Sequence, residues 1–153
     1  MTQAELTEQD WQVRLFIHDF FREQERPPTC QETAHQFTIT GEEARQCFER
    51  LNQNHRIFLE PGSDVIRMAH PFSAVPTPYR VTTGGHQYYA NCAWDSLGIP
   101  AALHDDARIE ATLPSTGETV TYGIQSGQLI GSDAGIVHFL KPFGQWYDDL
   151  IDT

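Results

Sequence analysis

The chain has 153 residues, of which 39% are hydrophobic and 20% charged, as expected of a soluble globular protein with one ordinary domain or two very small ones. Its formal net charge of −11 and its scattered Lys and Arg residues disfavour nucleic acid as a partner. No stretch approaches the roughly 18 consecutive apolar residues of a membrane span. The polar first ten residues lack the pattern of a signal or transit peptide. We therefore expect a cytoplasmic protein with no membrane partner and with reduced thiols.

Helical patterns fill the first 53 residues. The spacing of apolar residues predicts a helix over residues 7–25, which Thr7 can cap and in which Asp10 favours the helix dipole. Thr29, with Glu32 three residues later, has the capping-box pattern of a short helix that continues through Phe37. A third helix is expected to begin near Gly41, with an apolar face made by Ala44, Cys47, Phe48 and Leu51.

A hairpin pattern and a proline-rich stretch follow the helices. Two apolar runs within residues 56–68 flank Pro61-Gly62, which suits a type II turn. Three helices and a hairpin wing are typical of a winged helix-turn-helix, so we expect a winged-helix-like domain over residues 1–70. Three prolines between residues 70 and 78 indicate an extended segment, and we expect a domain junction over residues 71–80.

Strand patterns dominate the rest of the chain, which predicts a small mixed β-sheet domain with short helices over residues 81–153. Two strand-like runs flank Gly84-Gly85, a hairpin signal. Residues 107–113 alternate between apolar and polar, and a turn leads from them into a strand over residues 118–124. The apolar residues 135–140 are expected to form a buried strand. The fold class predicted from these patterns is α+β.

The stretch "YYANCAWDSLGIP" contains the candidate active site. Asn91 is a good helix cap, and the helix is expected to stop at Gly98-Ile99-Pro100. Cys92 would then lie in the first turn, where the dipole favours a thiolate and lowers its pKa. Asp95, three residues later, lies on the same helix face. As a carboxylate it would oppose thiolate formation, whereas as a neutral acid it could donate a proton.

A structural role for the same residues is the alternative. Free cysteines are often buried and only fill space, and an acid in a first turn can simply stabilise the helix. A lone C-x-x-D motif is weak evidence for catalysis.

The longer stretch "PFSAVPTPYRV…GGHQYYANCAWDSLGIPAAL" resembles the organomercurial (alkylmercury) lyase family. The resemblance implies a winged-helix-like domain followed by a mixed-sheet domain. It also implies that Cys92 is the nucleophilic cysteine and Asp95 the proton-handling aspartate. It is strong over residues 71–103 and looser over the remaining residues up to about His138.

One departure from the family concerns its second cysteine, which lies on a late strand before a Val-His-Phe-like run. Here Ala134 or Gly135 occupies that place, and no cysteine follows Cys92. Two thiolates hold a soft metal such as mercury far better than one. Cys47 is expected in the helical core, and Cys30 at a helix start, so neither is at a matching position.

Other residues are assigned to the pocket or to structure. The seven histidines lack zinc-site spacing, so we expect no dedicated metal site and no cofactor, with Cys92 as a candidate mercury ligand. His138 and Asp133 are candidate substrate-binding residues, although a structural strand histidine and a turn aspartate are the commoner roles. Tyr89 and Trp94 are candidates for the pocket wall, or for the core.

The leading hypothesis is a lyase of the organomercurial lyase type. Cys92 attacks or ligates a small organic or organometallic substrate, and Asp95 transfers a proton that cleaves or rearranges it. The missing thiol favours a repurposed lyase or isomerase with a non-mercury substrate. The alternative is a non-catalytic module that binds a thiophilic metal or a small ligand. A winged-helix DNA-binding regulator is less favoured, because residues 41–56 carry three glutamates against three arginines, which makes a poor recognition surface.

Overall fold

Three helices form the N-terminal part of the structure, a computed structural model that describes residues 5–131, 135–139, 141–142 and 145–146. They are α1 (Glu8–Gln24), α2 (Cys30–Phe37) and α3 (Gly41–Gln53). Each begins with a complete capping box, in which a threonine side chain and an acid three residues later satisfy each other's backbone amides. The helices expected from the sequence, and the buried face of α3, are confirmed.

The acid of the first capping box, Asp10, also holds α1 against α3. Its side chain is fully buried (0% exposed) and lies 2.8–2.9 Å from Nη2 and Nε of Arg50. It also accepts the backbone N–H of Thr7 at 2.8 Å. Burial raises the pKa of Asp10, but the hydrogen bonds from Arg50 and Thr7 outweigh burial and lower it.

Replacing Asp10 by asparagine is expected to lower the free energy of unfolding by about 3 kcal/mol at neutral pH, because Arg50 loses its partner. Since the pKa of Asp10 is depressed in the folded state, the stabilisation is present above the unfolded pKa and is lost as pH falls through the folded one. Urea unfolding at neutral and acidic pH measures both effects. The exposed Asp19, 3.5 Å from Arg22, is the matched control, and Asp19→Asn should cost less than about 0.5 kcal/mol.

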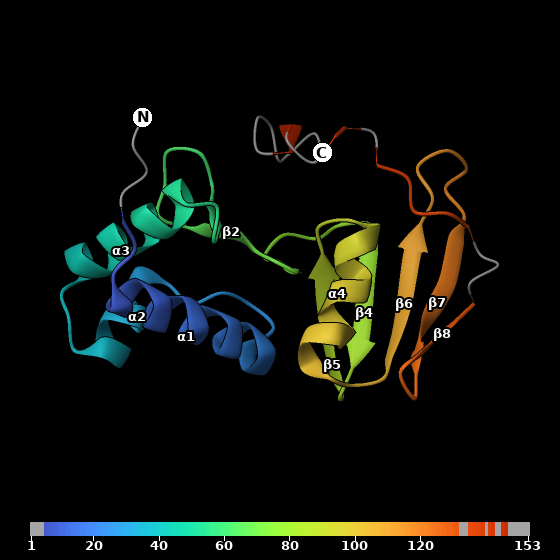
Figure 1. The fold of residues 1–153 in the computed structure, drawn as a ribbon, viewed down its shortest axis with the longest axis horizontal. Coiled ribbons are helices and arrows are strands. Elements are labelled where there is room, and N and C mark those ends of the chain that lie inside the picture. Colours follow the sequence, from blue (N-terminus) through green and yellow to red (C-terminus); the bar gives the residue numbers. More distant parts are fainter. Residues whose placement is uncertain (1–4, 132–134, 140, 143–144, 147–153) are drawn as a thin grey trace.

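Among the described residues, eight strands form one sheet in the order β1-β2-β3-β5-β4-β6-β7-β8 (Figure 1). The strands are β1 (Phe58–Leu59), β2 (Ile66–Ala69), β3 (Phe72–Ser73), β4 (Tyr79–Thr83), β5 (His86–Ala90), β6 (Ala107–Thr112), β7 (Thr119–Gln125) and β8 (Gln128–Ile130). All neighbouring pairs are antiparallel, so the expected mixed sheet is wrong. Most connections are too short for the crossover that a parallel pair requires.

Two hairpins predicted from turn residues are confirmed. β1 and β2 pair across Pro61-Gly62, where Gly62 has φ +72°. β4 and β5 pair across Gly84-Gly85, whose φ values of +56° and +83° fit a type I′ turn. β3 pairs with both β2 and β5, so the sheet continues through the proline-rich stretch. The winged-helix-like domain and the division at residues 71–80 remain predictions.

Helix α4 (Ala93–Leu103) forms a long crossover of the sheet. β5 and β6 both pair with β4, and α4 carries the chain across β4 from one to the other. The expected stop at Gly98-Ile99-Pro100 is wrong, because Pro100 lies inside the helix. Ile99 is 0% exposed, and packing of this kind overrides the poor helix propensity of Gly and Pro.

One face of the sheet carries the core. Phe72 and Tyr79 both pair with Ala90, and Tyr79 also pairs with Ala111. Because directly paired residues share a face, all four lie on the same face of the sheet. Phe21 of α1 stacks on Phe72 with centroids 5.3 Å apart, while Ile99 of α4 belongs to the same buried cluster. Helices α1 and α4 therefore both contribute to this core.

The apolar residues 135–140 do not form the expected buried strand in the part that the structure describes. Residues 135–139 have no regular secondary structure, and Ile136 is 95% exposed. β8 already pairs with the outer edge of β7, which removes that edge as a partner. An apolar run alone cannot distinguish a strand from a covering segment.

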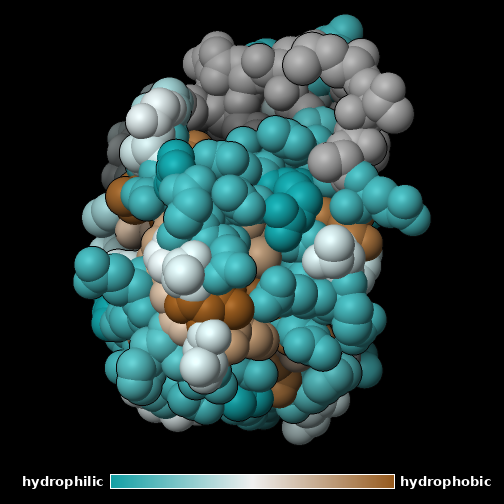
Figure 2. All heavy atoms as spheres, turned by 90° about the vertical axis from the view of Figure 1, so that its left-hand side faces the viewer, coloured by the Kyte–Doolittle hydropathy of each residue, from teal (hydrophilic) through white to brown (hydrophobic). Residues whose placement is uncertain are grey.

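The helical end of the molecule is mostly hydrophilic, with a small group of apolar side chains near the centre of the face shown (Figure 2). Within the described residues, no helix has the length and apolar character needed to cross a membrane.

Candidate functional site

A cavity of about 740 Å³ opens at the N-terminus of α4. Its walls come from the start of α4, from β4, β6 and β7, and from residues 135–139. Cys92 and Asp95 both line it, together with mostly apolar side chains such as Leu97, Val120 and Phe139. Concave, largely apolar cavities with a few convergent polar groups are typical of small-molecule sites.

Cys92 is the N-cap residue of α4, one position earlier in the helix than expected, and Asn91 does not cap it. Burial raises the pKa of the Cys92 thiol, and the nearby Asp95 carboxylate raises it further. The backbone amides of Asp95 and Trp94 oppose this without reversing it. The expectation of a lowered pKa is therefore wrong, because burial and a like charge outweigh the helix terminus.

Asp95→Asn is expected to lower the pKa of Cys92, because it removes the neighbouring negative charge while burial persists. The measurement is the rate of Cys92 alkylation by iodoacetamide against pH, with the site identified by peptide mapping. A midpoint that stays in place or moves to higher pH would contradict the electrostatic coupling.

Two further side chains converge on Asp95. Nδ2 of Asn91 donates to Oδ2 of Asp95 at 3.2 Å, and Nδ1 of His70 lies 3.4 Å from the same oxygen. The carboxylate is 13% exposed and the imidazole 36% exposed. The sequence pattern does not indicate either contact, because Asn91 suits a helix cap and His70 is the last residue of the predicted N-terminal domain.

A pair of tyrosines flanks Cys92 on the sheet side. Burial raises the pKa of Tyr79 and of Tyr122, and the proximity of Cys92 contributes in both cases. Tyr122 Oη lies 2.8 Å from Oγ of Ser96, which itself donates to the carbonyl oxygen of Ala93 at 2.6 Å. Tyr122 is therefore the donor in that pair. Strand alternation in residues 79–83 was the signal that could have identified Tyr79.

The other candidate residues are only partly brought together. Trp94 and His138 line the cavity, with Trp94 58% exposed and 6.2 Å from Phe139 between ring centroids. Tyr89 pairs with Arg80 and so lies on the face opposite Tyr79, away from the cavity. Asp133 is outside the described residues.

The position of the second family thiol is also only partly described. Ala134 lies outside the described residues, while Gly135 lines the cavity. Burial raises the pKa of Cys30 to about 12 and that of Cys47 to about 11. Both belong to the N-terminal helices, and Cys47 is 1% exposed in the core. In the described part of the chain, no three His, Cys, Asp or Glu side chains form a group that could hold a metal ion.

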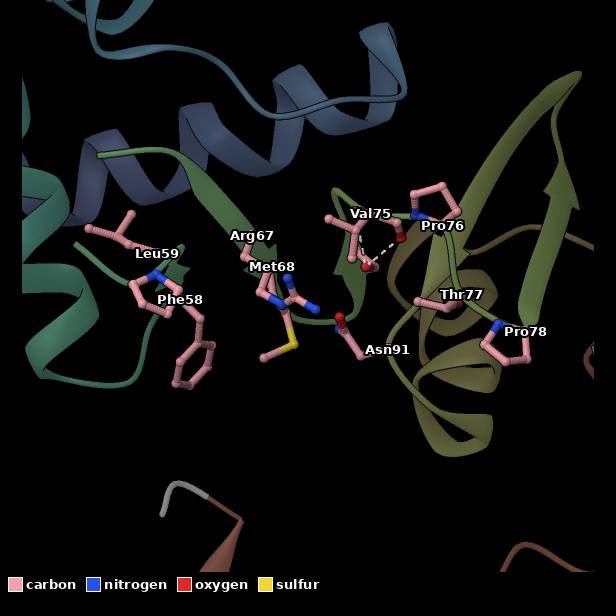
Figure 3. Close-up of a pocket in the computed structure, with 11 residues that line it drawn as sticks. Phe58, Leu59, Arg67, Met68, Val75, Pro76, Thr77, Pro78 and Asn91 are labelled. Atoms are coloured by element: carbon pink, nitrogen blue, oxygen red, sulfur yellow. Dashed lines mark hydrogen bonds between the residues drawn. The ribbon is translucent and has the colours of Figure 1, made fainter. Parts of the chain in front are cut away.

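A second cavity, of about 400 Å³, shares Met68 and Asn91 with the first. Figure 3 shows the residues that line this second cavity. Its polar side chains have partners within the chain. Arg67 lies 2.9 Å from Glu60, and Ser73 donates to the carbonyl oxygen of Val75 at 2.8 Å. The cavity therefore gives no clear indication of ligand chemistry, but it exposes a second side of Asn91.

Comparison with known proteins identifies a single family. The family model described as alkylmercury lyase matches residues 72–150. Alkylmercury lyases of Bacillus cereus and Clostridium butyricum are each 27% identical over 107 residues, which is 69% of this chain and 48% of each relative. The chain thus spans about half the length of these curated relatives. The crystal structure of the mercury-bound form of MerB2 has a similar fold, with a TM-score of 0.67 and 25% identity, and the match covers 82% of this chain and 60% of that one.

Proposed function

The chain belongs to the alkylmercury lyase family, and we propose that it cleaves carbon–mercury bonds by protonation, with Cys92 holding the mercury and Asp95 carrying the proton. The observation that carries the proposal is the contact between these two side chains at the mouth of a largely apolar cavity. Thiolate sulfur is a preferred ligand of soft metals, and the apolar walls suit the organic group.

The reaction begins with a protonated thiol. Mercury in R–Hg–X replaces the thiol proton of Cys92, so that a sulfur–mercury bond forms and X⁻ leaves. Asp95, adjacent to the sulfur, accepts the released proton. It then delivers this proton to the carbon, and the electron pair of the carbon–mercury bond becomes the new carbon–hydrogen bond. R–H leaves, and Hg(II) stays on the Cys92 sulfur until a free thiol in solution removes it.

The raised pKa of Cys92 is compatible with this sequence of steps. A thiol that remains protonated keeps its proton next to Asp95 until mercury displaces it. The low exposure of Asp95 limits exchange of the proton with bulk water.

The proposal is tested by turnover of a phenylmercury salt in the presence of excess small thiol. We expect more than one equivalent of benzene per protein chain, measured by gas chromatography. Release of no benzene together with a stoichiometric protein–phenylmercury complex would instead establish a binding module. That second candidate function is favoured by one observation, the absence of any cysteine after Cys92 in the sequence.

Restoring a thiol separates weakened family chemistry from a repurposed site. Ala134→Cys is expected to increase the affinity for Hg(II) by at least about 10-fold, because two thiolates replace one. Gly135 is the poorer position, since its φ of +156° favours glycine. Affinity is measured by competition with a small dithiol, with Ala134→Ser as the control. Equal affinities of the two variants would indicate that the pocket has been reshaped for another substrate.

A further inference from the structure

The Asp95 carboxylate has two unequal oxygens. Oδ2 receives the amide of Asn91 at 3.2 Å and faces Nδ1 of His70 at 3.4 Å. Donors on one oxygen stabilise negative charge there, so a proton is better placed on the other oxygen. Oδ1 is therefore the oxygen on which a proton would be better placed.

The two side chains that face Oδ2 come from different segments of the chain. Asn91 directly follows β5 and lines both cavities, and Figure 3 shows its side chain in the smaller one. The His70 ring packs edge-on against Phe58 at 5.6 Å between centroids, and its carbonyl oxygen lies 3.0 Å from Nε2 of His18. Gly98 lets α4 approach this turn closely, since a Cβ there would lie 3.2 Å from Cβ of Pro71.

We propose that Asn91 and His70 are positioning residues that hold Oδ2 of Asp95 and so present Oδ1 to the Cys92 sulfur and the bound carbon. This inference rests on the proposed function of Cys92 and Asp95. The cavity of about 740 Å³ is wide compared with a carboxyl group, so a rotating carboxyl would lose alignment with the carbon–mercury bond. Fixed orientation of a proton carrier contributes strongly to rate, and supporting contacts of this kind are typically worth about 10–100-fold in activity.

A purely structural role for these contacts predicts a different outcome. If Asn91 and His70 only stabilised the start of α4, their replacement would lower the unfolding temperature and would reduce every step at the site alike. A positioning role instead slows carbon–mercury cleavage selectively. The thiol proton released during capture can also pass to water, whereas cleavage requires a proton aligned with the carbon.

The experiment compares Asn91→Leu, His70→Leu and His70→Asn with the wild-type chain, using phenylmercury acetate. Intact mass follows formation of the Cys92–mercury–phenyl adduct, and gas chromatography follows benzene release. Each leucine variant should form the adduct at the wild-type rate but release benzene about 10-fold more slowly. His70→Asn keeps a donor near the position of Nδ1 and should stay within about threefold of wild type. His86→Leu, which removes an exposed contact with Glu25, is the control and should not change either rate.

The outcomes separate the two proposals. A wild-type chain that forms the adduct and releases no benzene overturns the proposed function. A wild-type chain that turns over, with leucine variants that release benzene at its rate, overturns the positioning role alone. Loss of adduct formation and benzene release in parallel, together with a lowered unfolding temperature, also overturns it in favour of the structural role.

Discussion

Replacing Cys92 by serine is expected to reduce turnover of phenylmercury by at least about 1,000-fold, because the hydroxyl oxygen is a poor ligand for a soft metal. Cys92 is also the one cysteine that lines the described cavity. The substitution is nearly isosteric at a half-buried N-cap, where serine is a favourable residue, so the fold should persist. Benzene release and the unfolding temperature are measured on the same sample.

The matched control is Cys30→Ser, at the start of α2 and outside the cavity. Burial and nearby acidic charge hold the pKa of Cys30 at about 12, so its thiol is a poor nucleophile at neutral pH. This variant should retain wild-type turnover. A Cys92→Ser chain that turns over as fast as the control would show that the C-x-x-D turn is only packing.

Local signals in the sequence predicted local structure well. The three helix starts follow from a threonine and an acid three residues later, a pattern that needs no distant partner. The turn at Gly84-Gly85 is similarly local, because positive φ at both positions is a property of the glycines themselves. Strand alternation in residues 107–113 predicted the buried face of β6 for the same reason.

Features set by packing were not predictable in this way. α4 continues through Pro100 because Ile99 is buried, which depends on elements far away in the sequence. The antiparallel order of the sheet depends on which strand edges are available for pairing. The pattern of a single strand does not contain that information. The run at residues 135–139 is apolar because it covers the cavity, yet its composition resembles that of a buried strand.

The candidate site illustrates both situations. The three-residue spacing of Cys92 and Asp95 predicted, from helix geometry alone, that the two side chains lie close together. The predicted direction of the Cys92 pKa shift was wrong, because the prediction considered the helix terminus but not the burial of the thiol. His70 could not be connected with Asp95 from the sequence, because 25 positions and three strands separate them.

Replacing Asp95 by asparagine is expected to separate the two halves of the reaction. The amide keeps the size of the carboxyl group, but it cannot take up and return a proton. Loss of the negative charge lowers the pKa of Cys92, so capture of phenylmercury should be at least as fast as in the wild-type chain. Benzene release should fall by at least about 1,000-fold, and the Cys92–mercury–phenyl adduct should accumulate to one equivalent in intact mass spectra.

The double variant Cys92→Ser/Asp95→Asn provides the test of joint action. Residues that act as one unit lose nearly all activity on the first replacement, so the double loss should be close to that of Cys92→Ser alone. Independent contributions would instead multiply. Asp105→Asn, on an exposed residue after α4, is the charge-matched control and should change neither capture nor cleavage. Benzene release by Asp95→Asn at the wild-type rate would remove Asp95 as the proton carrier, and the proton would then have to come from another polar group of the cavity, such as His138.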